Sequence, residues 1–387
     1  LYTNHTEHLG GQASLWHELR YFNENGSLSS TGYTRKSFTG NNGQEEGYVR
    51  YDTTLMVTNE EDATTWTAGD VISDAVSWSS SVRMGGISYG RDFSLRPDLV
   101  TWPLPEFSGE AAVPTSVDLF INGYRSGSTQ LQPGPFTVTN LPYINGAGDA
   151  VLITTDALGR QVSTTMPFYV TSELLKQGLS DGAVTVGSLR RNYGIKNFDY
   201  GPAAGSGSYR YGLTDWLTLE GHGEAAEELA LGGAGTIVKL GRYGVVNSSY
   251  THSRLRGEEG GQINWGYQYS TSAFSLATQH SRRDRGYGNL ALYDQPTIYD
   301  EKNQPIASLS RNTDQYSLTF NLGDFGNIGA AWIGVESFDS QKTELLNLSW
   351  SRNLWGSSSL YLAASRDQQR GDWTVAMSLQ IPLGDRD

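Results

Sequence analysis

Large apolar and small polar residues alternate along most of the C-terminal half of the chain. Within residues 263–270, every odd position is apolar or aromatic and every even position is small or polar. The same two-residue period returns in residues 316–322, 346–351 and 373–381. Because side chains alternate across a strand, each segment has one apolar face and one polar face. About a dozen such strands predict a sheet with lipid on one side and water on the other, which is a transmembrane β-barrel.

The overall composition is compatible with a barrel and excludes an α-helical membrane protein. Only 37% of the 387 residues are hydrophobic and the mean hydropathy is −0.44. No run of about 18 apolar residues occurs, as a membrane-spanning helix would require. A barrel tolerates this average because half of each strand faces a polar lumen. The 22 tyrosines suit membrane interfaces, where an apolar ring and a polar tip are both satisfied.

Three regions differ in composition and predict the domain organisation. Residues 1–96 contain about five strand-like runs, one of them at 76–93. Residues 97–170 hold eight of the twelve prolines, and their short β-runs between Pro and Gly turns predict a β-sandwich inserted into the larger sheet. Residues 171–387 return to alternation with about twelve strands. Their long loop at 284–314 is expected outside the wall or over its mouth.

The charge and the cysteine count exclude several classes of protein. The net charge of −13 argues against a nucleic-acid partner, because phosphate binding needs a basic surface. The absence of Cys from the sequence excludes disulfide frameworks, thiolate metal sites and Cys nucleophiles. Nothing in the composition indicates a cofactor.

The sequence offers little support for catalysis. Residues 86–90 read G-I-S-Y-G, which fits the nucleophile-elbow pattern, but they lie inside an alternating strand instead of a strand-to-helix turn. Glu220, His222 and Glu224 have the residue types of acid–base chemistry, yet they alternate with Leu and Gly. A polar row facing the lumen is the favoured interpretation. No catalytic, metal-binding or cofactor-binding residue is therefore predicted.

A gate is the other role considered for charged residues. Arg190 and Arg191 are expected to adjoin the exit from the insert, where they are candidates to pair with its carboxylates, such as Asp149 or Asp156. Because surface ion pairs are weak, the pairing alone does not establish a gate.

Several blocks in and around the insert closely resemble the outer-membrane usher of the chaperone–usher pathway, which assembles fimbriae in Gram-negative bacteria. The blocks occur in the family's order, and the resemblance extends over essentially the whole chain. They are P-D-L-V-T-W-P-L-P at 97–105, A-V-P-T-S-V-D-L-F-I-N-G at 112–123, I-N-G-A-G at 144–148, T-D-A-L-G-R at 155–160, L-R-R-N-Y-G at 189–194 and Y-R-Y-G-L at 209–213.

The resemblance implies a fold. Ushers have a barrel of two dozen strands with a plug domain between strands six and seven, so a plug is expected at about 103–167. The roughly seventeen strands counted here would make an incomplete barrel, and the family's periplasmic terminal domains are not in the sequence. The chain is therefore expected to be an internal piece of an usher. The connectors of the plug are expected to include Pro97, Trp102, Pro103, Pro105 and Pro167.

The resemblance also implies a function, a location and partners. The usher is expected in the outer membrane of a Gram-negative bacterium, in contact with its lipid. It would receive fimbrial subunits from a periplasmic chaperone, pass them through the lumen and block that lumen with the plug at rest. The resemblance is also compatible with a homodimer.

One alternative class remains open from the residues alone. A secreted β-sandwich that binds carbohydrate, or an adhesin fragment, would also be rich in strands and aromatics. Such a protein would be soluble, whereas a barrel stays in membranes until detergent extracts it.

Overall fold

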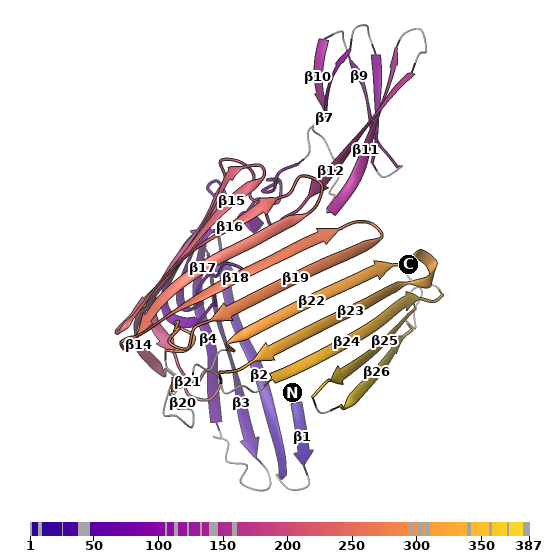
Figure 1. The fold of residues 1–387 in the computed structure, drawn as a ribbon. Coiled ribbons are helices and arrows are strands. Elements are labelled where there is room, and N and C mark those ends of the chain that lie inside the picture. Colours follow the sequence, from indigo (N-terminus) through magenta and orange to yellow (C-terminus); the bar gives the residue numbers. More distant parts are fainter. Residues whose placement is uncertain are drawn as a thin grey trace.

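The chain folds as one large antiparallel β-sheet with a smaller β-structure inserted into it (Figure 1). The computed structural model describes residues 2–6, 10–24, 26–37, 47–104, 107–111, 115–121, 124–131, 134–138, 146–156, 161–293, 298–299, 305–306, 310–338, 342–355, 358–369 and 371–381.

The large sheet contains 18 strands. Each strand pairs with its neighbours in chain order, except that β6 pairs with β13 across the insert and β19 pairs with β22. Six strands precede the insert and twelve follow it, where the sequence predicted about five and about twelve. The strands are β1 (Tyr2–Thr6), β2 (Gly10–Asn23), β3 (Gly26–Ser37), β4 (Gly47–Asn59), β5 (Thr64–Ile72), β6 (Arg83–Arg91), β13 (Ser180–Arg190), β14 (Tyr200–Thr214), β15 (Leu217–Ala226), β16 (Leu229–Lys239), β17 (Val245–Leu255), β18 (Glu258–Ser270), β19 (Phe274–Arg283), β22 (Asn312–Asn321), β23 (Asn327–Glu336), β24 (Lys342–Asn353), β25 (Ser359–Asp367) and β26 (Trp373–Gln380).

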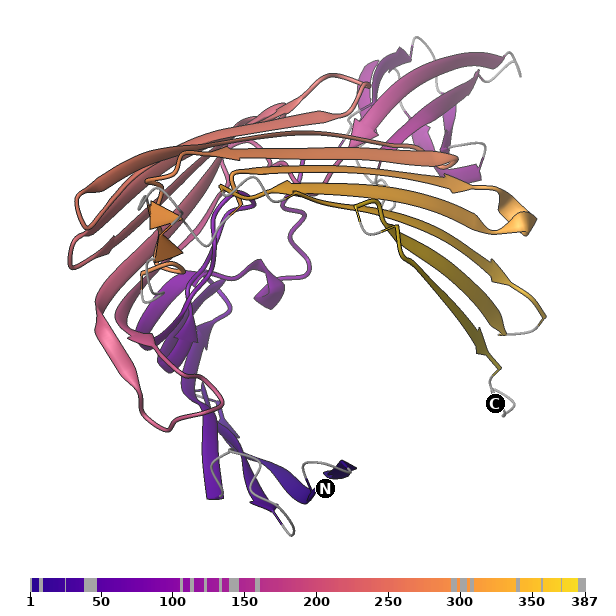
Figure 2. The same ribbon diagram turned by 60° about the horizontal axis from the view of Figure 1, so that its bottom comes forward.

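The sheet curls around a hollow and stays open between its first and last strands. Figure 2 shows the two chain ends on opposite sides of the gap. Within the described ranges, β1 pairs only with β2 and β26 only with β25. The fold is therefore the wall of a large antiparallel β-barrel that is incomplete in this chain, as the sequence predicted.

The two faces of the wall differ as the alternation predicted. In β18, Ile263 and Trp265 are 50% and 39% exposed on the convex face, whereas Gln262 and Asn264 are each 4% exposed on the concave face. Antiparallel partners share a face, so the registers from β18 to β26 carry this assignment across the wall. The convex face is mainly apolar, and the concave face is mainly polar.

The convex face of β24 shows how wide the apolar band is. Leu346, Leu348 and Trp350 lie between two charged residues, Glu344 and Arg352, on this face. The charged residues are eight positions apart, which is about 27 Å along a strand and about 20 Å across a membrane at a tilt near 45°. A lipid-facing band of an outer-membrane-type barrel has comparable dimensions.

The concave face of β19 and β22–β26 is named here the neutral wall, because its charged residues are confined to the strand ends. Within the described parts of these strands, the concave positions carry only two charged residues, Arg283 and Asp367. Three of its rows, written in pairing order, are Ser281–Thr313–Val335–Thr343, Gln279–Gln315–Ile333–Leu345 and Ala277–Ser317–Ala331–Asn347–Ser365.

The insert forms two small sheets that share no strand with the wall. Four strands pair in the order β12–β11–β8–β9, and β7 pairs with β10. In both views the insert stands beyond the strand ends and clear of the hollow (Figures 1 and 2). Its strands are β7 (Phe107–Ala111), β8 (Thr115–Ile121), β9 (Tyr124–Leu131), β10 (Gly134–Val138), β11 (Gly146–Asp156) and β12 (Gln161–Val170).

The insert contacts the wall at the rim where its two connectors enter, named here the connector rim. The ring of Tyr169 stacks on that of Tyr269 at the end of β18, with 6.0 Å between centroids and 13° between planes. Tyr169 is buried in one cluster with Leu174, Ile237 and Val245. Burial raises the pKa of Tyr169 to about 12, so its phenol stays neutral.

The predicted connector residues have different positions. Pro97, Trp102 and Pro103 lie between β6 and the insert, whereas Pro105 is outside the described residues. The expectation for Pro167 is wrong, because it lies inside β12 opposite Asp149. Since β12 is an edge strand, the missing N–H of proline is tolerated there.

The helices of the described residues are two single 3-10 turns, Phe93–Leu95 and Gly323–Phe325. Neither is long enough to cross a membrane. The G-I-S-Y-G motif at 86–90 lies within β6, as predicted, and makes no strand-to-helix turn.

Candidate functional site

Two loops fold into the hollow and cover part of the concave face (Figure 2). One is residues 73–82, between β5 and β6, and the other is residues 284–293, after β19. Both positions correct the sequence-based predictions. Residues 76–82 leave the sheet although 76–93 was expected to be a single strand, and 284–293 turn inward instead of lying outside the wall or over its mouth.

Strand β15 holds the first loop through Glu220. One carboxylate oxygen accepts a hydrogen bond from Nε1 of Trp78 at 2.8 Å, and the other accepts from Nε of Arg210 at 2.9 Å. The backbone carbonyl of Trp78 accepts from Nε2 of Gln262 at 3.2 Å. Asp74, in the same loop, accepts a hydrogen bond from the hydroxyl of Ser208. The loop is therefore fastened to β14, β15 and β18.

The same strand holds the second loop through Glu224. Its Oε2 accepts the backbone N–H of Leu290 at 2.6 Å, and its Oε1 lies 3.1 Å from Nε2 of His222. The His222 ring also meets Trp78 edge-on at 6.0 Å. Burial, together with the nearby Glu224, raises the pKa of Tyr287 in this loop to about 12.

These three residues of β15 form a clasp for two loops that are far apart in the sequence. Glu220, His222 and Glu224 are only 5–6% exposed. A buried carboxylate is costly unless donors satisfy it, and each of these two has at least one donor from a loop. Removing a loop contact would leave a carboxylate without that partner. We name Glu220, His222 and Glu224 the β15 clasp.

A hydrophobic cluster supports the second loop beside the clasp. Leu290 and Tyr293 pack with Met84, Leu189 and Leu229 from three strands of the wall. The second loop is therefore held by apolar burial as well as by hydrogen bonds.

Arg190 does not lie beside the insert. It ends β13 at the rim opposite the connectors, about 34 Å along the strand from Ser180. Its guanidinium donates to the carbonyls of Lys196 and Asp199 and lies 3.8 Å from Asp70. The expectation that it follows the insert in space is therefore wrong.

Arg191, the other gating candidate, also lies at the rim opposite the connectors. Its side chain lines a pocket there together with Arg83 and Leu290. The side chains of Asp149 and Asp156, its expected partners, are outside the described residues.

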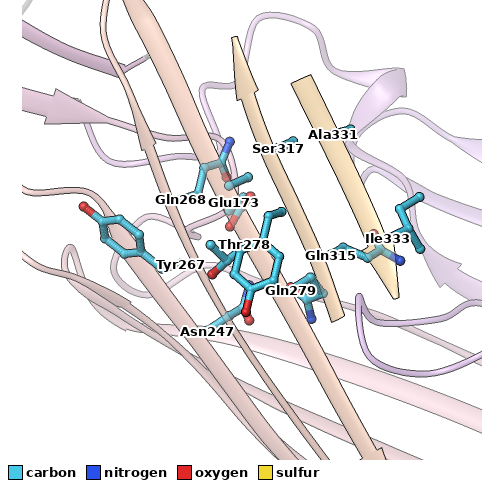
Figure 3. A pocket seen from close by; sticks show the side chains of 12 residues that line it. Glu173, Asn247, Tyr267, Gln268, Thr278, Gln279, Gln315, Ser317, Ala331 and Ile333 are labelled. Carbon is cyan, nitrogen blue, oxygen red and sulfur yellow. The ribbon is translucent and has the colours of Figure 1, made fainter. Parts of the chain in front are cut away.

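A second polar pocket, of about 200 Å³, opens on the wall near the connector rim (Figure 3). Gln268, Gln279 and Gln315 line it together with Glu173 from the connector after the insert. Burial raises the pKa of Glu173 above its usual range. Among the described residues, no three His, Cys, Asp or Glu side chains group as metal ligands would. The amides and the single carboxylate have the chemistry of a water-lined surface.

We expect Trp78→Phe to loosen residues 73–82, because it removes the hydrogen bond to Glu220. A hydrogen bond to a charged group contributes about 1.5–3 kcal/mol, so amide hydrogen exchange in this loop should be at least roughly tenfold faster. Trp332→Phe, on the convex face of β23, is the matched control. Unchanged exchange of residues 73–82 in the Trp78 variant would show that the clasp does not hold the loop.

Comparison with known proteins relates this wall to one family. The family model described as "Outer membrane usher protein" matches residues 29–387. The usher FaeD of Escherichia coli is 27% identical over 322 residues, which cover 77% of this chain and 38% of that protein. The F1 capsule-anchoring protein of Yersinia pestis is 23% identical, and the match covers 78% of this chain and 37% of that protein. The chain thus spans less than two fifths of the length of these curated relatives.

Solved structures show the same fold. The translocation pore of the P pilus usher PapC has a TM-score of 0.58 and 18% identity, covering 99% of this chain and 80% of that one. An E. coli P pilus tip assembly intermediate, PapC-PapD-PapK-PapG, has a TM-score of 0.67 and 18% identity, covering 97% of this chain and 46% of that one. Since the family model matches most of the sequence, the chain belongs to the outer membrane usher family.

Proposed function

We propose that this chain forms most of the pore wall of an usher that secretes fimbrial subunits across the outer membrane. The carrying observation is the curled sheet with an apolar convex face and a polar concave face around a hollow. Such a wall separates lipid from water, and a barrel of this strand number encloses an aqueous channel. The proposal assigns no chemical reaction to the chain.

The partners follow from the relatives. The second of the two PapC structures, the P pilus tip assembly intermediate, also contains PapD, PapK and PapG. By analogy, we propose that periplasmic chaperone–subunit complexes deliver folded subunits to this pore. The alternative of a secreted carbohydrate-binding sandwich is not favoured, because the large sheet leaves its apolar face uncovered.

We further propose that the insert is the plug of this pore. Three observations support the proposal. The insert lies between the sixth and seventh strands of the wall, and both of its connectors enter at one rim. Its described contacts with the wall centre on Tyr169, which stacks on Tyr269 and packs against Ile237 and Val245, and this area is small enough to release. Because the insert stands clear of the hollow, this arrangement corresponds to an open pore.

Cross-linking the insert to the rim tests the plug. This part of the sequence has no Cys, so Tyr169→Cys with Tyr269→Cys introduces one reactive pair. In the complete usher, a short bifunctional thiol reagent should fix the insert at the rim and hold the pore open in planar bilayers. The two single-Cys variants, treated alike, are the controls.

The outcomes separate the plug from the pore. A cross-linked double variant that conducts no more than the singles would contradict the plug and leave the pore proposal standing. An untreated usher that is inserted in the membrane and secretes no subunit in cells would contradict the pore itself.

A further inference from the structure

The neutral wall differs from the rest of the concave face in charge. Charged residues make up 18% of the chain, yet the concave positions of β19 and β22–β26 carry them only at strand ends, among the described residues. The same strands do bear charges elsewhere. Arg282, Asp314 and Glu344, for example, lie at the borders of the apolar band on the convex face.

The charged sector of the concave face is closed to large molecules. Arg210, Glu220, His222 and Glu224 lie on β14 and β15, where residues 73–82 and 284–293 cover them. The three clasp residues are 5–6% exposed. The loops therefore cover the charged residues of β14 and β15.

The neutral wall is open by contrast. Gln315, Ser317 and Thr319 on β22 are exposed, and Ser349 on β24 is partly exposed. The two inward loops are held by β14, β15 and β18. The connector residue Glu173 does reach the neutral wall, because it lines one pocket with Gln315 and Ser317. On the neutral wall, a large body inside the hollow can thus touch hydroxyl and amide groups together with the larger side chains of Ile333, Leu345 and Tyr361.

Neutral polar groups suit a surface along which something moves. A hydroxyl or amide exchanges hydrogen bonds with water at little net cost, whereas each fixed charge attracts or repels a charged group by an amount that varies along the path. Charge patches select one partner and one orientation. On a wall without charge patches, the electrostatic energy of a folded domain with a mixed-charge surface changes little from one position to the next.

We propose that the neutral wall is the surface along which a folded protein domain slides during secretion, and that the clasp side of the hollow does not contact it. The occupant is a folded domain with a mixed-charge surface, because a small solute in a channel this wide would not need a matched wall. This inference rests on the proposed function, and it adds which sector of the pore carries the cargo.

Site-specific photo-cross-linking in the complete usher tests the proposal. A photoreactive amino acid is placed at Ser317 or Ser349 on the neutral wall, at Leu318 or Leu348 on the convex face, and at Ser206 in the covered sector. Cells supply the chaperone and subunits, and assembly is stalled while a subunit is inside the pore. We expect cross-links to the subunit from the two serines of the neutral wall and none above background from the other three positions.

A second variant measures the effect of charge. Ser317→Lys combined with Ser349→Lys places two charges on the path, and secretion of an acidic subunit should slow by about tenfold. Ser317→Asn with Ser349→Asn keeps the wall neutral and is the control. Detergent extraction and heat-modifiable migration confirm that each variant is folded in the membrane.

The outcomes distinguish this inference from the proposed function. Cross-links mainly from Ser206, or equal secretion by the Lys and Asn variants, would contradict the role of the neutral wall as the sliding surface. The usher would still secrete subunits in either case. A wild-type usher that secretes no subunit would overturn the proposed function instead.

Discussion

Leu348→Arg should destabilise the barrel of the complete usher by about 2–4 kcal/mol. Leu348 lies mid-way across the apolar band of β24, two residues from Leu346 and Trp350 on the convex face. An Arg side chain there would have to leave water for hydrocarbon, and it lies too far from either border to reach the headgroups without strain. Equilibrium unfolding in denaturant, with the usher in lipid vesicles, measures the loss.

The neighbouring residue supplies the control. Asn347 is on the concave face, so Asn347→Arg should change the free energy of unfolding by less than about 1 kcal/mol. Leu379, which the alternation also assigns to lipid, is a weaker test. It shares a row with Leu360 and Arg352, and Arg352 marks the border of the band. Equal losses for Leu348→Arg and Asn347→Arg would refute the assignment of the convex face to lipid.

Removal of the insert should produce a large, steady conductance in planar bilayers and sensitise cells to bulky antibiotics. The two connectors run side by side, because the N–H of Lys176 donates to the carbonyl of Thr101 at 2.8 Å. A short Gly/Ser linker can therefore replace residues 105–170 while β6 and β13 keep their pairing. The deletion removes the whole proposed plug, so the insert can no longer block the interior of the barrel.

The two inward loops should limit that conductance. Residues 73–82 and 284–293 stay in the hollow when the insert is removed, since they are fastened to the β15 clasp. Adding Trp78→Ala to the deletion should raise the conductance further, whereas adding Trp332→Ala should not. A deletion variant that is inserted in the membrane and conducts no more than the parent would contradict the plug.

The alternation predicted the wall because it is a local property of each strand. Ile263 and Asn264 could be assigned to opposite faces from their positions alone, and the registers confirm it. The clasp could not be predicted in the same way. Glu220, His222 and Glu224 were recognised as a concave polar row, but the partners of that row are Trp78 and Leu290, far away in the sequence.

The errors share a physical cause, which is that position in sequence is a poor guide to position in space. Val76 and Trp78 alternate with serines like strand residues, yet Trp78 is buried against Glu220 because its N–H finds a carboxylate there. The serine run at 79–81 was the available signal for a break in the strand. Arg190 follows the insert closely in sequence, but β13 carries it to the opposite rim.

The pairing of β6 with β13 has a consequence for how the chain folds. Gly90 and Ala183 are partners in this ladder, whereas most neighbouring strands of the wall are joined by tight turns. Closing a disordered loop of roughly ninety residues costs about 3 kcal/mol more than closing a four-residue turn. If the insert folds first, its own structure brings the connectors together and most of that entropy has already been lost. Early folding of the insert would therefore speed the pairing of β6 with β13, which joins the two halves of the wall. A slow-folding insert would delay membrane assembly without changing the final barrel.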